Sequence, residues 1–244
     1  DTGVATVRGT LSATTDASHS AITLDQLAVD GTVALTTHGN GAATVVNDAG
    51  LNFAESTVGG ALSATATTGD ISDSGNLAIT GAATFITRAT GSDIILDASG
   101  NAFSNAVTMK ADTGGDEAFG NITFVDSGAV KIETSANTDA DGELLIDGST
   151  DGAVGGNLSV TATTGNITQG VAVAVGGTSS FTTSANDATI TLTETSNAFT
   201  GALLVTTNDN TDGADGVYTA DVSIDGGTTG LIMGLSTIDG ALTL

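Results

Sequence analysis

Eleven residues of this chain occur almost unchanged at two places. Residues 61–71 read ALSATATTGDI, and residues 157–167, 96 positions later, read NLSVTATTGNI. Neither copy carries an obvious catalytic side chain, so the repetition indicates a repeated structural unit. Self-similarity at a fixed spacing is the signature of stacked repeat architectures.

A shorter period of about 50 residues lies inside the longer one. The stretch LAVDGTVALTT from Leu27 resembles LAITGAATFIT from Leu77, and TLSAT at 10–14 resembles ALSAT at 61–65. We therefore expect a single solenoid segment over residues 1–244. Its repeat units are predicted near 11–61, 62–110 and 158–205, with more divergent coils and acidic loop insertions at 111–157 and 206–244.

Within each unit, apolar residues alternate with Thr, Ser or Asp, as in ATITLTET at 188–195. Alternation with a period of two predicts strands. Clusters of Gly, Asn, Asp and Ser, such as TTGD, predict the turns between strands. No stretch has a convincing helical period.

The strands recur at a regular distance that predicts the architecture. Leu62, Phe85, Val107 and Val130 are 22 or 23 residues apart. This spacing predicts an all-β parallel β-solenoid of about ten coils of 22–23 residues, in which like residues stack on like. At about 4.8 Å per strand, such a rod is about 50 Å long. Two sandwich domains of 96 residues each are the weaker alternative.

The composition excludes several classes of partner. The formal net charge is −24, with only four Lys and Arg against 28 Asp and Glu. Nucleic acid and anionic membrane surfaces would be repelled, so neither is expected as a partner. The chain has no Cys, and no apolar run approaches the length of a membrane span. We expect an extracellular protein, either processed or part of a longer chain.

The string STVGGALSATATTGDI and its second copy GAVGGNLSVTATTGNI resemble the repeats of large bacterial surface proteins. These are the filamentous-haemagglutinin-like adhesins of two-partner secretion. The resemblance covers most of residues 50–205 and identifies a style of repeat. It implies a right-handed parallel β-helix, secretion to the bacterial cell surface and a role as stalk or fibre.

Two acidic turns, NTDADG at 137–142 and NDNTDG at 208–213, are candidate calcium sites. Oxygen ligands at alternate positions followed by Gly resemble the start of an EF-hand loop, although no Glu stands at position 12. An ordinary polar turn is the stronger interpretation. The predicted ligands are Asn137, Asp139, Asp141, Asn208, Asn210, Asp212 and Asp215.

No constellation in the sequence predicts catalysis. His19 and His38 are the only histidines, and we expect both on surface turns. The seven Phe recur at matched repeat positions and are predicted to fill the interior. Thr-rich strands raise the possibility of ice binding, but the Thr spacing does not predict one clean T-x-T column.

The leading hypothesis is a structural and adhesive shaft of an extracellular bacterial fibre, without enzymatic activity. Open strand edges favour end-to-end assembly of copies into a filament. Copies of the chain itself and host or neighbour-cell glycans or proteins are the expected partners. The alternative is a calcium- or glycan-binding module on a β-helix scaffold.

Overall fold

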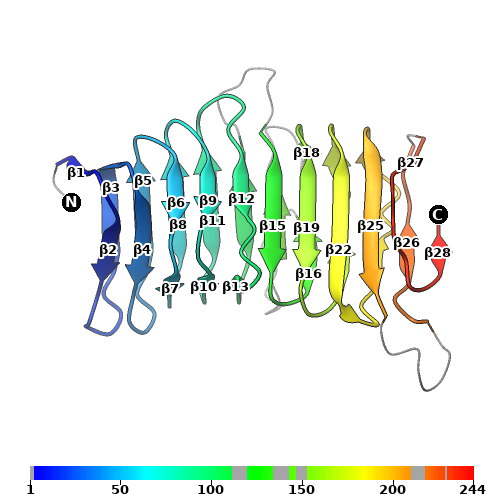
Figure 1. Ribbon diagram of the computed structural model, residues 1–244, viewed down its shortest axis with the longest axis horizontal. Coiled ribbons are helices and arrows are strands. Elements are labelled where there is room, and N and C mark those ends of the chain that lie inside the picture. The colour runs from blue at the N-terminus through cyan, green and yellow to red at the C-terminus, as the bar shows by residue number, and fades with distance from the viewer. Residues whose placement is uncertain (1–2, 112–119, 134–142, 147–152, 210–217, 229) are drawn as a thin grey trace.

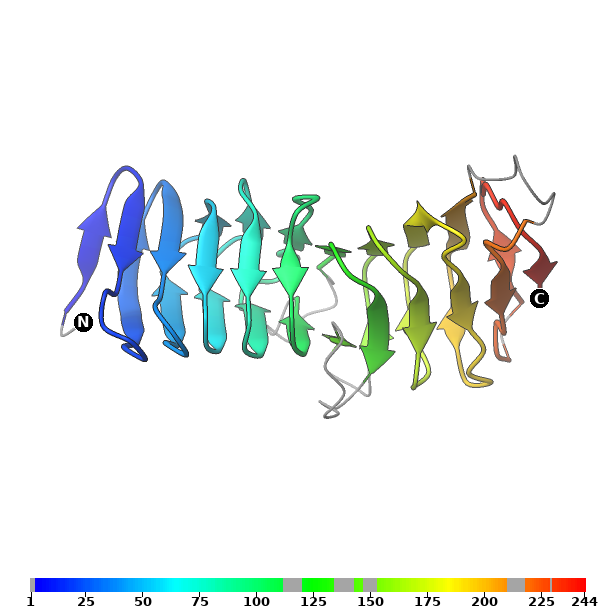
Figure 2. The same cartoon turned by 90° about the horizontal axis from the view of Figure 1, so that it is seen from below.

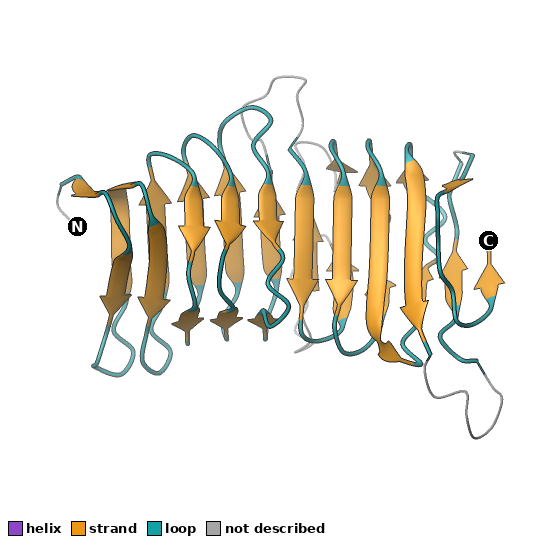
Figure 3. Cartoon of the chain, in the orientation of Figure 1, coloured by secondary structure: helices purple, strands orange, loops and turns teal. Residues whose placement is uncertain are grey.

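The protein is an all-β parallel solenoid of about nine turns, close to the ten predicted. The computed structural model describes residues 3–111, 120–133, 143–146, 153–209, 218–228 and 230–244. Within these ranges every regular element is a strand, and no helix is present that could cross a membrane. The strands form two facing layers along one long axis, with the termini at opposite ends (Figures 1 and 3).

One layer is a twelve-stranded sheet, which we call sheet A. In spatial order its strands are β1 (Ala5–Val7), β3 (Ile22–Val29), β5 (Ala43–Asn47), β8 (Leu62–Ala66), β11 (Ala83–Thr87), β14 (Val107–Lys110), β17 (Glu143–Ile146), β16 (Val130–Glu133), β20 (Ile167–Gln169), β23 (Ile190–Leu192), β26 (Val222–Ile224) and β28 (Leu242–Thr243).

The facing layer, sheet B, is the main part of a thirteen-stranded sheet. Its strands in order are β2 (Leu11–Thr14), β4 (Thr32–Thr36), β6 (Leu51–Phe53), β9 (Ile71–Asp73), β12 (Ile94–Leu96), β15 (Ile122–Asp126), β19 (Leu158–Ala162), β22 (Ser179–Asn186), β25 (Ala202–Asn208) and β27 (Ile232–Met233).

Two short ladders close the coils at the edges of the layers. The first side sheet is joined to sheet B through β4 and contains β7 (Ser56–Val58), β10 (Leu77–Ile79) and β13 (Ala102–Phe103). The second side sheet is separate and contains β18 (Ala153–Val154), β21 (Ala174–Val175) and β24 (Ala198–Phe199).

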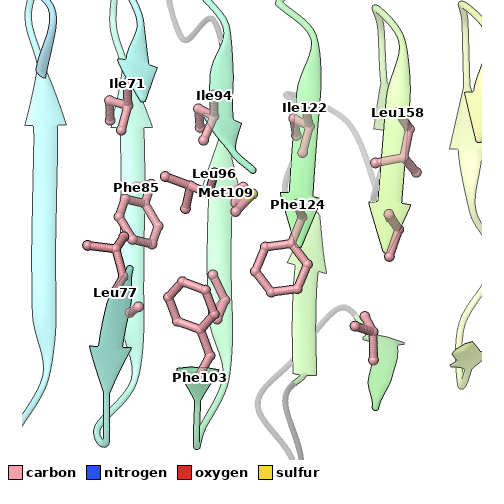
Figure 4. Packing of buried hydrophobic residues seen from close by; sticks show 14 of the residues in the cluster. Ile71, Leu77, Phe85, Ile94, Leu96, Phe103, Met109, Ile122, Phe124 and Leu158 are labelled. Carbon is pink, nitrogen blue, oxygen red and sulfur yellow. The ribbon is translucent and has the colours of Figure 1, made fainter. Parts of the chain in front are cut away.

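Apolar side chains stack in rows between the layers because each strand of a coil is in register with the strand of the next. In sheet B, one such row contains Ile71, Ile94, Ile122 and Leu158, all almost fully buried (Figure 4). Each buried aliphatic side chain of this size contributes about 1.5–3 kcal/mol of hydrophobic stabilisation. A single coil contributes only one residue to each row, so the core forms only when coils stack.

The predicted interior position of the Phe residues is confirmed for those that the structure describes. Phe53, Phe85, Phe103 and Phe124 form a chain of ring contacts with centroids 5.3–6.2 Å apart. Phe181 and Phe199 make a separate edge-to-face contact at 6.2 Å. All six are at most 5% exposed, whereas Phe119 lies outside the described residues.

Glycine lets successive coils approach closely at one turn. The Gly81 N–H donates to Gly60 O at 3.1 Å, and the Gly201 N–H donates to Gly177 O at 3.1 Å. A Cβ atom on Gly81 would lie 2.4 Å from the Gly60 carbonyl carbon, which is closer than side chains tolerate. The repeated Gly of this turn is therefore required by sterics.

The two copies of the eleven-residue repeat lie on opposite layers. Leu62, Ala83 and Val107 are in register in sheet A, whereas their equivalents 96 residues later, Leu158, Ser179 and Leu203, are in register in sheet B. The expectation that like residues stack on like is therefore wrong for these two copies, which lie in different sheets. Between the two copies, the repeat pattern has moved from sheet A to sheet B.

The turnover happens twice, at points that we call the first and second switch. Equivalent strands start 22 residues apart at Leu11 and Val33, both in sheet B. The next equivalent start, Leu62, is 29 residues further on and lies in sheet A. From Val107 to Leu158 the distance is 51 residues, and the chain returns to sheet B. At the first switch the extra residues carry the chain past one face, whereas part of the 51-residue stretch at the second switch lies outside the described residues.

The side sheets change edge with the switches. β7, β10 and β13 lie along the lower edge of the molecule in Figure 1, whereas β18 lies at the upper edge. The turns connecting the coils therefore also exchange edges. Seen from below, the coils still follow one another along a single axis (Figure 2). A continuous rod thus presents one repeat pattern on two opposite sides.

Candidate functional site

Most of the predicted calcium ligands lie outside the described residues, namely Asn137, Asp139, Asp141, Asn210, Asp212 and Asp215. The exception is Asn208, which ends β25. Its Nδ2 donates to Ser184 O at 3.1 Å and to Asn186 Oδ1 at 3.2 Å, so this amide ties one coil to the preceding one. Among the described residues, no group of three or more His, Cys, Asp or Glu side chains could hold a metal. Calcium binding stays a prediction.

His19 and His38 lie on exposed turns, as predicted. The turns stack on each other, since the His19 N–H donates to His38 O at 2.9 Å. The Asn40 N–H donates to His19 Nδ1 at 3.2 Å. The hydrogen bonds of these residues therefore join neighbouring coils.

A buried polar network in the first repeat copy was not predicted. Asn101 is fully buried before β13, and its Nδ2 donates to Asp73 Oδ2 at 2.6 Å. Asn101 Oδ1 accepts the Leu77 N–H at 2.8 Å. Asp73 Oδ1 accepts the Asp97 N–H at 2.9 Å. Burial raises the pKa of Asp73, although the bonds from Asn101 and the backbone amides oppose the shift.

The second copy builds the same network with a neutral partner. Asn197 and Gln169 exchange two amide hydrogen bonds, at 2.8 and 3.0 Å. Asn197 Oδ1 also accepts the Val173 N–H at 2.8 Å, and Asn197 Nδ2 donates to Asp225 O at 2.9 Å. Asn197 thus satisfies backbone groups of three successive coils, whereas the side chain of Asn101 satisfies the backbone N–H of Leu77.

The sequence contains a signal for this network. Asn101 and Asn197 are the first residues of the NAF triplets in the two matched stretches, GNAFSNAV and SNAFTGAL. A polar residue that recurs directly before a buried strand indicates a backbone cap. The predicted site residues all lie in or next to the acidic turns and include neither Asn101 nor Asn197.

A polar groove of about 390 Å³ lies at the first switch. Strand ends and turns of three coils line it, and its polar side chains are Asp30, Asn52, Asp70 and Ser72. Asn52 Oδ1 is buried without a hydrogen-bond partner, whereas Asp70 Oδ1 accepts the Asp93 N–H at 2.8 Å. Carboxylate, amide and hydroxyl groups suit sugar hydroxyls or a hard cation. No lining residue is aromatic.

The outer faces carry hydroxyl columns that the sequence spacing did not predict. In sheet A, Thr44, Ser63, Thr84 and Thr108 are in register on four coils. The positions two residues further on are Val46, Thr65, Ile86 and Lys110, so this single column is not a T-x-T array. Paired Thr side chains stabilise sheets without any ligand, so the column has a sufficient structural role.

Comparison with known proteins places the chain in a family. The model described as Repeats of unknown function (DUF5649) matches residues 40–110 and 119–206. No match was found among curated proteins or among solved structures. The two matched ranges contain both copies of the polar network and most of the stacked coils. The chain therefore belongs to this family of repeats of unknown function.

Proposed function

We propose that the chain is a structural and adhesive shaft segment of an extracellular bacterial surface fibre. The observation that carries this proposal is the uninterrupted ladder of parallel strands along one axis. The function is then mechanical, because the strand pairing of every coil holds the next. No catalysis is part of the proposed role.

The direction of the backbone hydrogen bonds supports a stiff rod. In sheet A, each coil donates to the next coil along the axis at 2.8–3.0 Å. The bonds run from Ile22 N to Ala42 O, from Ala43 N to Ala61 O, from Leu62 N to Ala82 O and from Ala83 N to Ala106 O. Bending the rod would strain many such bonds at once.

The charge and the repeat style support the proposed location and partners. A net charge of −24 keeps an extended surface solvated. The resemblance to adhesins of two-partner secretion supports display on the bacterial surface. End-to-end assembly would reuse the pairing that joins successive coils, so further copies of the chain are proposed partners.

Binding of calcium or a glycan is the second candidate function, supported by the polar groove at the first switch. We expect Asp70→Asn and Asn52→Ala to weaken retention on a glycan array, with exposed Asp25→Asn as the matched control. Loss of retention in chelator would assign the role to a cation. Equal retention by all variants would contradict the groove as a site.

Negative-stain electron microscopy of the purified chain, with calcium and then with chelator, tests the proposed shaft. We expect straight rods of about 50 Å per chain. Longer filaments would support end-to-end assembly, and separate rods in both conditions would contradict it. Antibody labelling of intact producing cells checks the location. Labelling only after permeabilisation would contradict surface display.

A further inference from the structure

The first switch is marked by a side chain that takes the place of a strand. Leu27–Val29 of β3 pair with β1 on one side. On the other side, β5 ends at Asn47, which is 1% exposed. Asn47 Oδ1 accepts the Val29 N–H at 2.9 Å, and Asn47 Nδ2 donates to Val29 O at 3.0 Å. One amide therefore satisfies both backbone groups that a further strand would have paired.

The second switch has a related cap, in which a carboxyl group accepts one backbone N–H. β15 ends at Asp126, which is 1% exposed. Asp126 Oδ1 accepts the N–H of Phe103 at 3.2 Å. Phe103 belongs to β13, the last strand of the first side sheet. Asp126 therefore ends the ladder of that side sheet, as Asn47 ends the ladder between β1 and residues 27–29 of β3.

The two caps differ in one atom. Asn47 Nδ2 donates both to Val29 O and to Gly50 O, the latter at 2.7 Å. The matching atom of the second cap, Asp126 Oδ2, is buried and has no hydrogen-bond partner. An ionised carboxylate only accepts hydrogen bonds, whereas a protonated one can donate. Protonation would give Asp126 Oδ2 a hydrogen to donate, as the Nδ2 of the Asn47 amide does.

The surroundings of Asp126 favour that neutral form. Burial raises the pKa of Asp126, and the amides of Phe103, Gly128 and Ser127 lower it by less. The neighbouring strands β12, β13 and β19 carry no titratable side chain. The carboxylates closest through the network are Asp73, which reaches the site through Asn101, and Asp97 after β12. Lys131 follows on β16.

We propose that Asn47 and Asp126 are the terminating caps of the two switches, and that protonation of Asp126 makes the second cap sensitive to pH. Ionisation costs more in the folded than in the unfolded chain. Stability at the second switch is therefore highest below pH 3.8, the ordinary pKa of the carboxyl group. It falls as the pH rises through the higher pKa that Asp126 has in the folded chain. The first switch, closed by an amide, has no such dependence.

Reciprocal variants of the full chain test the proposal. We expect Asp126→Asn to match the wild type near pH 4 and to exchange the Phe103 amide about tenfold more slowly at pH 7. Asn47→Asp should transfer the pH dependence to the Val29 amide. Exposed Asp25→Asn is the control and should change neither amide.

Two outcomes would overturn the proposal. A constant ratio of exchange rates between wild type and Asp126→Asn from pH 4 to pH 8 would show that ionisation of Asp126 carries no cost. Equal exchange in Asp126→Ala and Asp126→Asn at the Phe103 amide would show that the side chain is no cap. Both measurements are made on folded protein at single amides, so a small loss of global stability does not obscure them.

Discussion

The two repeat copies, 62–110 and 158–205, use one sequence pattern with different electrostatics. Asn101 pairs with the carboxylate of Asp73, whereas Asn197 pairs with the amide of Gln169. The backbone contact is the same in both, since Leu77 N and Val173 N each donate to the Asn Oδ1 at 2.8 Å. The difference teaches that the fold requires the Asn, while its partner is free to change charge.

The copies also differ in the layer that they occupy. Phe85 pairs with Ala64 and Met109 in sheet A, and its equivalent Phe181 pairs with Val160 and Val205 in sheet B. Both rings are fully buried. The interior of the solenoid requires only an apolar side chain of suitable size at this position of the coil. The same sequence pattern can therefore form a strand of either layer.

Removing the Asn should have the largest effect and should separate the copies. Each buried polar group left without a partner costs about 1–3 kcal/mol. Asn197→Ala orphans Val173 N and the Gln169 amide, so we expect a loss of about 3–5 kcal/mol, against about 2–3 kcal/mol for Asn101→Ala. Urea unfolding with hydrogen exchange at each copy measures this, because solenoids can open locally.

Exposed Asn40→Ala is the control for both substitutions, and it should change stability by less than about 0.5 kcal/mol. Equal losses for the two buried variants would mean that the additional hydrogen bonds of Asn197, to Leu192 O and Asp225 O, contribute no measurable stability.

The close approach at the Gly turn should fail equally in both copies. A Cβ atom would lie 2.4 Å from a backbone atom at Gly81 and 2.3 Å from one at Gly201. We expect Gly81→Ala and Gly201→Ala each to cost about 1–3 kcal/mol in thermal or urea unfolding. Gly9→Ala, where nothing lies within 4 Å, is the matched control. A tolerated Gly81→Ala would show that the coils can separate at this turn.

The sequence predicted the fold because the strand signal and the repeat spacing are both local. The sequence did not predict the switches, because the 96-residue repeat is the same whether the second copy lies in the same sheet as the first or in the opposite one. The cue was the 29-residue step between Val33 and Leu62, where neighbouring steps are 21–24. Asn47 and Asp126 were missed because one buried polar side chain at a strand end resembles an ordinary turn residue.

Giving the second copy the charge of the first should have a moderate effect. Gln169→Asp loses the Nε2 donor to Asn197 Oδ1, at 2.8 Å, and to Val171 O, at 2.6 Å. We expect a loss of about 1–2 kcal/mol at pH 7 in urea unfolding. The exposed variant Gln26→Glu adds the same charge without these bonds and should have little effect. An unchanged Gln169→Asp would mean that the amide and carboxylate networks are equivalent.

Giving the first copy the neutral partner of the second should have the smallest effect, with a sign that depends on pH. Burial raises the pKa of Asp73, so the folded chain holds this proton to higher pH than the unfolded chain. The free energy of unfolding then falls as the pH rises above 3.8, the ordinary pKa of the group, and through its higher pKa in the folded chain.

The variant Asp73→Gln removes this dependence of stability on pH, and its amide can exchange two hydrogen bonds with Asn101 as Gln169 does with Asn197. We expect the melting temperature of the variant to exceed that of the wild type by about 1–3 °C at pH 7 and by less near pH 4. A variant that is less stable than the wild type at pH 7 would mean that the three hydrogen bonds of the Asp73 carboxylate outweigh its burial, and that the charge in the first copy is stabilising.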